Sequence, residues 1–477
     1  MNLEEDGSTI GTRQFCVRVQ FRLLGQFSVA SVSACSTYHA HSEPAERVYR
    51  MGDKELANGV ASPTPQSLVT EEHVQAALRK DKGPDAHLTS WSVEDFTRKG
   101  DNYACVVSSV RVSYTKGKED GEVVYVVKLN PCRNVESFKE FTHTIFEKEC
   151  RFYLSLVPDL NRMLEGAGQT LLRVPRCYHG TLEDDREMIF LEDLRPRGFK
   201  MFDRKKGLDV AHATLILQEL ARLHAASVLL QTETPDEDLS EKYSFLKRDW
   251  LDVGNDSPHS IQSLFDSYLC NAIDILKTVG GYERAIAWVE SLRPDLEQIF
   301  KSKLGMSKFN VVCHGDCWNN NVLFRYDADG RPVEVMLLDL QLCRRASPAT
   351  DLNYLLYTSI TGDVRKPNLE KFLASYYTSF ASVLRSADYE DFPSEKELME
   401  AFREHNVVAA IFSMMIVPIV LMESDDVPDL STLTDDNLDD LIDELKGNAL
   451  KMLDSNPLMR PRFLSMFDEF METGLIP

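Results

Sequence analysis

The sequence is poor in positive charge. Its 53 lysine and arginine residues are outnumbered by 75 aspartate and glutamate residues, which gives a formal net charge of -22 and a pI near 5.0. Nucleic acids and anionic membrane surfaces are bound through basic patches, so neither is an expected partner. A nucleotide is not excluded, because Mg²⁺ can hold phosphates against carboxylates.

Closely spaced cysteine pairs are also absent. None of the ten cysteines forms a Cys-x-x-Cys motif, and the nearest two, Cys313 and Cys317, are expected to play no chemical part. A disulfide framework or a cysteine-based zinc site is therefore not expected. A reduced, cytoplasmic protein is the simplest interpretation.

Long apolar runs are missing as well. The best candidate, Val407–Met422, is short and contains Pro418. A transmembrane helix needs about 20 apolar residues, so we expect a buried core helix here and no membrane span.

The first part of the chain lacks a sustained helical or strand period. Residues 15–40 mix arginine, serine and apolar residues, as a transit peptide does, but the acids at positions 4–6 argue against one. A linker-like run follows at Ser62–Pro65. We expect residues 1–65 to be a poorly ordered extension and the folded part to begin near Leu68.

The next region has the pattern of a β-rich unit. Alternating apolar and polar residues over Tyr103–Tyr114, a charged turn at Lys116–Gly121 and a β-branched run at Val123–Leu129 predict an antiparallel hairpin. A helix over Val135–Leu156, stopped by Pro158, is predicted to follow it. A second strand pair is predicted at Arg173–His179 and Glu187–Leu191.

Beyond Leu194 the pattern becomes mostly helical, and a chain of this length suits two or three packed units. We predict an α+β protein with a small β-rich lobe at residues 66–194 and a large helical lobe at residues 195–477. The predicted helices begin with Leu208–Leu230, Ser260–Val279 and Ala285–Leu304, and short strands are predicted at Phe309–Cys313, Val322–Tyr326 and Val335–Leu338.

The most specific motif is HGDCWNNN at residues 314–321. Asp316 follows a predicted strand, Asn321 comes five positions later, and a second apolar strand ends at Asp339. In-line phosphoryl transfer needs a carboxylate that accepts a hydroxyl proton and oxygen ligands that hold Mg²⁺ against phosphates. Asp316 is therefore the predicted catalytic base, and Asn321 and Asp339 are the predicted Mg²⁺ ligands.

Each of these features alone has a simpler interpretation. His-Gly-Asp is commonly a plain turn, Asp339 could cap a helix, and the asparagines could be turn residues. The order and spacing of the features together favour catalysis.

The motif His-Gly-Asp-x-Trp-x-x-Asn, followed by an apolar strand and Asp-x-Gln, resembles the ecdysteroid kinase-like family. Its members carry a CHK kinase-like domain and are related to choline kinases and aminoglycoside phosphotransferases. The resemblance runs from about Gly83 to the C-terminus. Gly100–Tyr103 resembles the family's nucleotide-covering turn, Met188–Leu194 its hinge strand, and Leu220–Ser227 its first large-lobe helix. The resemblance implies a bilobal protein kinase-like fold with a nucleotide-binding N-lobe and a catalytic, acceptor-binding C-lobe.

The resemblance also implies roles for individual residues. Lys128 would hold the ATP phosphates with Glu149 as its partner, and backbone groups of Glu192 to Leu194 would contact adenine. His314 would orient the catalytic turn rather than react.

Several of these residues have alternative interpretations. Lys128 could be an edge-strand lysine, and Glu149 could lie on a solvated helix face. Asp351 either braces the catalytic turn or caps a helix, and Trp318 either lines the acceptor pocket or packs in the core. Leu340 departs from the family, which usually has phenylalanine after the metal aspartate.

The implied function is transfer of the ATP γ-phosphate to a hydroxyl of a small molecule, either an ecdysteroid or another lipophilic alcohol. A choline or ethanolamine kinase is the alternative within the same class. A non-catalytic pseudokinase is disfavoured because Lys128, Asp316, Asn321 and Asp339 are all present. A protein kinase is disfavoured because no Ala-Pro-Glu segment follows Asp339. Protein partners and oligomeric state stay open.

Overall fold

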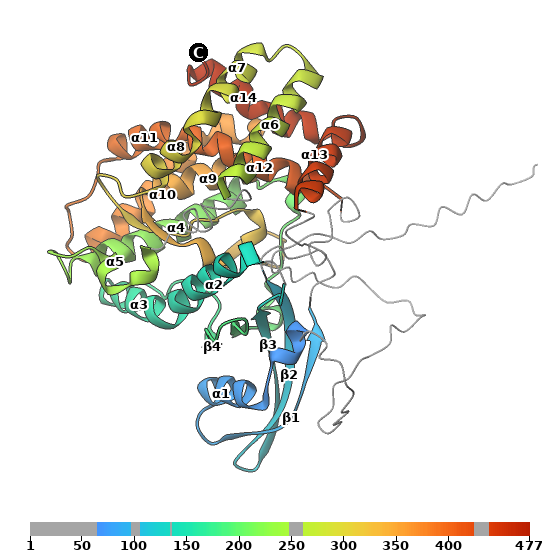
Figure 1. The fold of residues 1–477 in the computed structure, drawn as a ribbon. Helices are drawn as coiled ribbons and strands as arrows, with labels where there is room; N and C mark the ends of the chain where they lie inside the picture. The colour runs from blue at the N-terminus through green and yellow to red at the C-terminus, as the bar shows by residue number, and fades with distance from the viewer. Residues whose placement is uncertain (1–63, 97–104, 134–135, 248–260, 424–437) are drawn as a thin grey trace, which may run out of the picture.

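A computed structural model describes residues 64–96, 105–133, 136–247, 261–423 and 438–477. The predicted extension at residues 1–65 lies almost wholly outside these ranges. In Figure 1 a small lobe built on a β-sheet lies below a large helical lobe, and α2 lies between them. The predicted α+β, bilobal architecture is confirmed.

The small lobe contains a five-stranded antiparallel sheet in the order β1-β2-β3-β5-β4. The predicted hairpin is confirmed, but Lys116 pairs with Glu119, so most of the predicted turn is strand. β1 was not predicted, because a register shift between Leu88 and Ser90 interrupts its alternation. The strands are β1 Ala86–Asp95, β2 Val106–Lys116, β3 Glu119–Leu129, β4 Cys177–Thr181 and β5 Met188–Glu192.

Both faces of this sheet are covered. Val127 and Phe190 belong to the apolar cluster that contains the buried face of α1 (Glu71–Lys82). Val126 and Ile189 belong to the main core, together with Ile145 of α2 (Glu136–Arg151). Since successive side chains of a strand point to opposite faces, Lys128 lies on the same face as Val126 and is directed toward α2.

The prediction that Pro158 stops the α2 helix was wrong. A π-helical turn at Phe152–Leu156 follows α2 and leads directly into α3 (Val157–Gly166). Pro158 lies in the first turn of α3, directly after the π turn, where the local change in helical geometry accommodates a proline.

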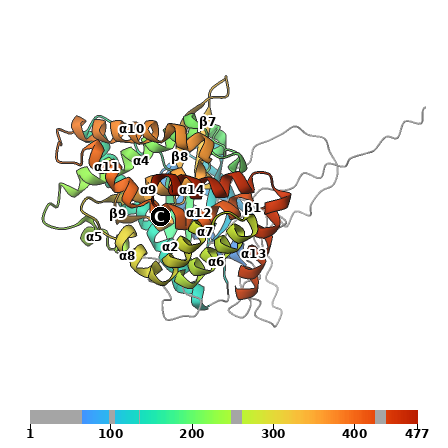
Figure 2. The same cartoon turned by 90° about the horizontal axis from the view of Figure 1, so that it is seen from above.

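The large lobe is mostly helical, and two short β-ribbons, β6–β9 and β7–β8, carry the candidate site. Figure 2 shows α9, α12 and α14 near the middle of this lobe. The predicted helix Ala285–Leu304 is two helices, because Arg293–Asp295 forms a 3₁₀ turn around Pro294. The helices are α4 Val210–Gln231, α5 Leu239–Lys242, α6 Ile261–Val279, α7 Glu283–Leu292, α8 Leu296–Leu304, α9 Ala349–Ser359, α10 Gly362–Ser386, α11 Glu395–Glu404, α12 Asn406–Leu421, α13 Leu438–Ser455 and α14 Met459–Thr473; the strands are β6 Val311–Cys313, β7 Val322–Tyr326, β8 Pro332–Leu337 and β9 Arg344–Ala346.

Two stretches of the described chain have the length and apolar composition of a membrane span: α4, and the bent pair α11–α12 if it is counted as one span. The apolar window of α4 is 83% buried inside the fold, as the core helix of a lobe would be. α12 covers the predicted core helix up to Leu421, one residue short of the predicted end, and most of its side chains are buried.

Candidate active site

A buried lysine joins the two lobes. Lys128 on β3 is 2% exposed, and its Nζ lies 2.7 Å from Oε2 of Glu149 on α2 and 2.6 Å from Oδ1 of Asp339 after β8. Burial works to lower the pKa of Lys128, but the carboxylates of Asp339 and Glu149 outweigh it and raise that pKa above its usual value. Lys128 is therefore a buried ammonium with two anionic partners, not an edge-strand lysine, and Glu149 does not lie on a solvated face.

The backbone at Asp339 turns its carboxylate toward this lysine. Asp339 has φ 64°, a left-handed conformation that aspartate adopts more readily than most residues. The preceding Leu338 donates its N–H to the carbonyl oxygen of Asn321 at 2.9 Å. The loop after β8 and the loop after β6 are thus joined next to the predicted metal ligands.

Two side chains hold the carboxylate of Asp316. The hydroxyl of Tyr354 on α9 donates to Oδ1 at 2.5 Å, and Nδ2 of Asn321 donates to Oδ2 at 2.8 Å. Burial, with the negative charge of Asp339 adding to it, raises the pKa of Asp316 from 3.8 to about 7, although both hydrogen bonds oppose the shift. A carboxyl group with a pKa near neutrality suits proton transfer at physiological pH.

Two buried oxygens in this site fit a divalent cation. Among the described residues, neither Asn321 Oδ1 nor Asp339 Oδ2 has a hydrogen-bond partner, and both atoms are inaccessible to solvent. Buried polar atoms are almost always paired, and carboxylate and amide oxygens are ligands that Mg²⁺ accepts. Asn321 and Asp339 are therefore suited to hold Mg²⁺.

Asp351 braces the catalytic turn from α9. Its Oδ2 accepts the N–H of His314 at 2.6 Å, and its Oδ1 accepts the N–H of Gly315 at 2.9 Å. Burial opposes ionisation, but the hydrogen bond with His224 (Nε2 to Oδ2, 3.0 Å) and the backbone N–H groups lower the pKa of Asp351. The bracing interpretation of Asp351 agrees with this geometry, since it bonds the turn rather than its own helix end.

Gly315 allows this turn to pack closely. Its φ is 84°, and a Cβ atom there would lie 2.1 Å from the carbonyl oxygen of Leu342. Only glycine fits such an approach. The imidazole of His314 is fully buried, and burial lowers its pKa. Its Nδ1 accepts the N–H of Asp316 at 3.3 Å, so His314 lies against backbone, as expected for an orienting residue.

Replacing Asp351 by asparagine is expected to lower the free energy of unfolding by about 2–3 kcal/mol, because a neutral amide cannot replace a carboxylate that accepts charge-assisted hydrogen bonds at both oxygens. Urea denaturation of the variant measures this. Asp454→Asn, at a side chain 91% exposed, is the matched control and should change stability by less than about 0.5 kcal/mol. Equal effects of the two substitutions would contradict the bracing role.

The predicted hinge residues lie at the end of β5, where Glu192 is the last strand residue and Leu194 follows it. The N–H of Glu192 donates to the carbonyl of Arg176 at 2.8 Å, and a carboxylate oxygen of Glu192 pairs with Arg197 at 3.1 Å. The carbonyl of Leu194 accepts from Arg197 and Phe199, and its side chain packs in a small cluster with Leu338. The predicted adenine contacts of Glu192 and Leu194 stay predictions, and the predicted nucleotide-covering turn Gly100–Tyr103 lies outside the described residues.

Three supporting residues were not found from the sequence. Tyr354 bonds Asp316, and His224 links Asp351 to the hydroxyl of Tyr376 at 2.7 Å. Lys148 donates to the carbonyl of Cys343 at 2.8 Å, which fixes α2 to the segment after Asp339. Tyr354 and His224 lie on helices with apolar neighbours, where the sequence pattern alone indicates core packing. Lys148 lies between Glu147 and Glu149, where the pattern indicates a solvated helix face.

Cys313, Cys317 and Trp318 are buried. Burial raises the pKa of both thiols well above the usual value, which agrees with the expectation that neither cysteine reacts. Trp318 is 5% exposed and belongs to the main core, which favours packing over lining a pocket.

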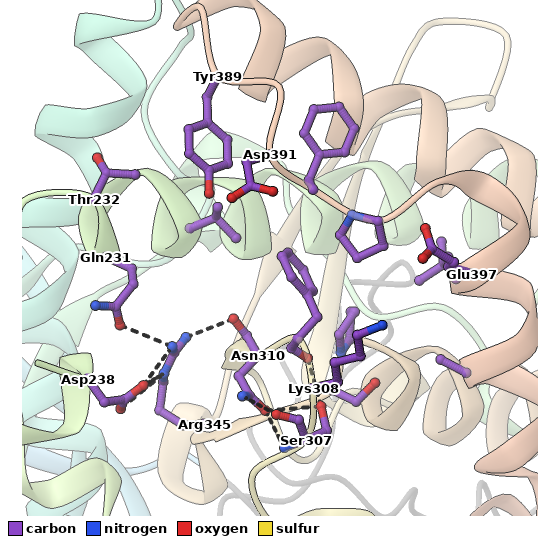
Figure 3. A pocket seen from close by; sticks show the side chains of 18 of the residues that line it. Gln231, Thr232, Asp238, Ser307, Lys308, Asn310, Arg345, Tyr389, Asp391 and Glu397 are labelled. Atoms are coloured by element: carbon purple, nitrogen blue, oxygen red, sulfur yellow. Dashed lines mark hydrogen bonds and ion pairs between the residues drawn. The ribbon is translucent and has the colours of Figure 1, made fainter. Parts of the chain in front are cut away.

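A cavity of about 1180 Å³ lies elsewhere in the large lobe. It is lined by Asn310, which precedes β6, and by Ser347, which follows β9. Because β6 and β9 are antiparallel, these residues are at the opposite end of the ribbon from His314 and Cys343. In Figure 3, Arg345 joins Gln231, Asp238 and Asn310 on one side of this cavity, and Tyr389 and Asp391 lie across from them.

The fold and the site define a class. A lysine on β3 paired with a helix glutamate, a loop aspartate beside an asparagine, and an aspartate after a strand are the parts that phosphoryl-transfer enzymes of the kinase-like fold share. The sequence matches the model of the ecdysteroid kinase-like family over residues 99–389, and the protein belongs to this family. The match includes all eight predicted site residues but is shorter than the predicted resemblance, which began near Gly83 and ran to the C-terminus.

Similar proteins are known in sequence and in structure. A kinase-like protein of Caenorhabditis elegans, described as uncharacterized, is 23% identical over 308 residues, 64% of this chain and 74% of that protein. An aminoglycoside 2'-phosphotransferase in complex with GDP aligns with 81% of this chain and 100% of its own at 13% identity and a TM-score of 0.33. A Haemophilus somnus protein titled as a fructosamine-3-kinase covers 74% of this chain and 97% of its own, at 12% identity and a TM-score of 0.29.

Proposed function

We propose that this protein transfers the γ-phosphate of ATP, with Mg²⁺, to a hydroxyl group of a small lipophilic alcohol such as an ecdysteroid. One observation carries the proposal: Lys128, Glu149 and Asp339 form one buried ion cluster across the two lobes. Separate sequence segments thus bring together a fixed cation and metal-ligating oxygens. Phosphoryl transfer from a nucleotide requires both kinds of group.

Each residue has a distinct part in this reaction. Asp316 accepts the proton of the acceptor hydroxyl as its oxygen attacks phosphorus and the bond to the ADP leaving oxygen breaks. Tyr354 and Asn321 hold that carboxylate in place. Lys128 binds the α and β phosphates, positioned by Glu149. Asn321 and Asp339 hold Mg²⁺, which when bound neutralises charge on the phosphates.

The choice of acceptor rests on the family. Its name points to ecdysteroids, whose hydroxyls are attached to a large apolar body. The alternative acceptors, choline and ethanolamine, are small and cationic or basic. A comparison of steroid with choline phosphorylation therefore distinguishes a kinase for lipophilic alcohols from a choline or ethanolamine kinase.

The test is ADP release with Mg²⁺ and ATP over a panel of ecdysteroids, plant phenolics, choline and ethanolamine. We expect turnover that depends on a lipophilic alcohol and is lost when Mg²⁺ is removed by chelation. Turnover with choline alone would move the assignment to the alternative. ATP binding without turnover on any acceptor would favour the pseudokinase.

A further inference from the structure

A second group of metal-ligating side chains lies in the small lobe. Nδ1 of His143 on α2 lies 2.9 Å from Oε1 of Glu187 and 3.5 Å from Oδ1 of Asp184, and all three atoms lie within 4.8 Å of one another. Glu187 directly precedes β5, and Asp184 lies in the β4–β5 connection. The three side chains therefore converge from two separate segments of the lobe.

The spacing of these atoms fits a small transition-metal ion. Zn²⁺ binds imidazole nitrogen and carboxylate oxygen at about 2.0–2.2 Å in tetrahedral geometry, which places neighbouring ligand atoms roughly 3.3–3.5 Å apart. The two distances from His143, 2.9 and 3.5 Å, lie close to this range. To seat an ion, Nδ1 of His143 and Oε1 of Glu187, which are hydrogen-bonded at 2.9 Å, must separate by roughly 0.5 Å.

The charge of the cluster also calls for a cation. Glu187 is 2% exposed, and in the described part of the chain its carboxylate contacts His143 and the Nδ2 of Asn130, at 2.6 Å, but no lysine or arginine. Buried carboxylates are normally paired with cations or bound to metals.

We propose that His143, Asp184 and Glu187 form a binding site for Zn²⁺, with water completing the coordination. The site would join elements that carry the phosphate-binding pair. His143 lies on α2 with Glu149, and Glu187 bonds Asn130, which follows Lys128 by two residues. Zinc would therefore stabilise the arrangement of β3 and α2 without entering the nucleotide site.

Zinc binding can be measured on the full chain without nucleotide or Mg²⁺ after treatment with a chelator. Zn²⁺ affinity is obtained by competition with a chromogenic chelator, and the geometry is read from the visible spectrum of bound Co²⁺. His143→Gln and Asp184→Asn remove ligands. Asp185→Asn is the matched control, because it removes the same charge from the same turn, and asparagine tolerates its left-handed φ of 61°.

We expect one zinc equivalent that is lost in His143→Gln and an intense, tetrahedral Co²⁺ spectrum. Asp184→Asn should weaken zinc binding by about 100-fold, and Asp185→Asn by no more than about 2-fold. Asp184 is 93% exposed, so its replacement should not disturb folding. Equal weakening by the two asparagine variants, or a zinc stoichiometry that His143→Gln does not change, would overturn the site. Because binding is measured without phosphoryl transfer, either result leaves the proposed function untouched.

Discussion

Replacing Asp316 by asparagine is expected to lower kcat for phosphoryl transfer by about 10²–10⁴-fold, because an amide cannot accept the proton of the acceptor hydroxyl. The KM for ATP should change less than kcat, since Lys128 and Asp339 keep their positions. The substitution is nearly isosteric, and the amide oxygen can still accept the Tyr354 hydroxyl at the position of Oδ1. The amide nitrogen at the position of Oδ2 cannot accept from Nδ2 of Asn321, so that one hydrogen bond is lost. Steady-state kinetics with the best acceptor from the panel measure both constants.

Tyr354→Phe is the graded control for this experiment. It removes one hydrogen bond to Asp316 but leaves the carboxylate, so a loss of about 10-fold in kcat, or 1.4 kcal/mol, is expected. Thermal unfolding should show that both variants are folded. A folded Asp316→Asn protein with full turnover would remove Asp316 from the mechanism.

Local sequence rules were sufficient for much of the candidate site. Motif spacing and strand ends predict Asp316, Asn321 and Asp339, whereas Lys128 and Glu149 are predicted from the resemblance to the family. The structure brings these residues together.

Long-range packing set the features that the sequence did not predict. Tyr354 lies 38 positions from Asp316 on an entirely buried helix. The sequence pattern of such a helix does not distinguish a tyrosine that bonds a catalytic residue from one that only packs in the core. The strand β1 was hidden by its register shift. The continuation of α2 through a π turn into α3 was hidden because Pro158 is an N-terminal helix residue as well as a helix breaker.

Replacing Lys128 by methionine is expected to lower the free energy of unfolding by about 3–5 kcal/mol, because Glu149 and Asp339 then lose their shared cation in a buried site. Methionine replaces the unbranched apolar stem of lysine and is only one atom shorter, so lost packing contributes little. The same change removes the phosphate-binding ammonium and should lower kcat by at least about 10²-fold. Chemical denaturation in a chelator isolates the stability effect from metal binding.

A double-mutant cycle separates charge from packing in this cluster. Glu149→Gln alone leaves Lys128 paired with Asp339 and should destabilise less than Lys128→Met does. In the double variant one of the two stranded carboxylates is neutral, so the combined loss should fall short of the sum by about 1–3 kcal/mol. Strict additivity would mean that Lys128 and Glu149 do not interact in the folded protein. In that case the 2.7 Å contact between them would not be what holds α2 against β3.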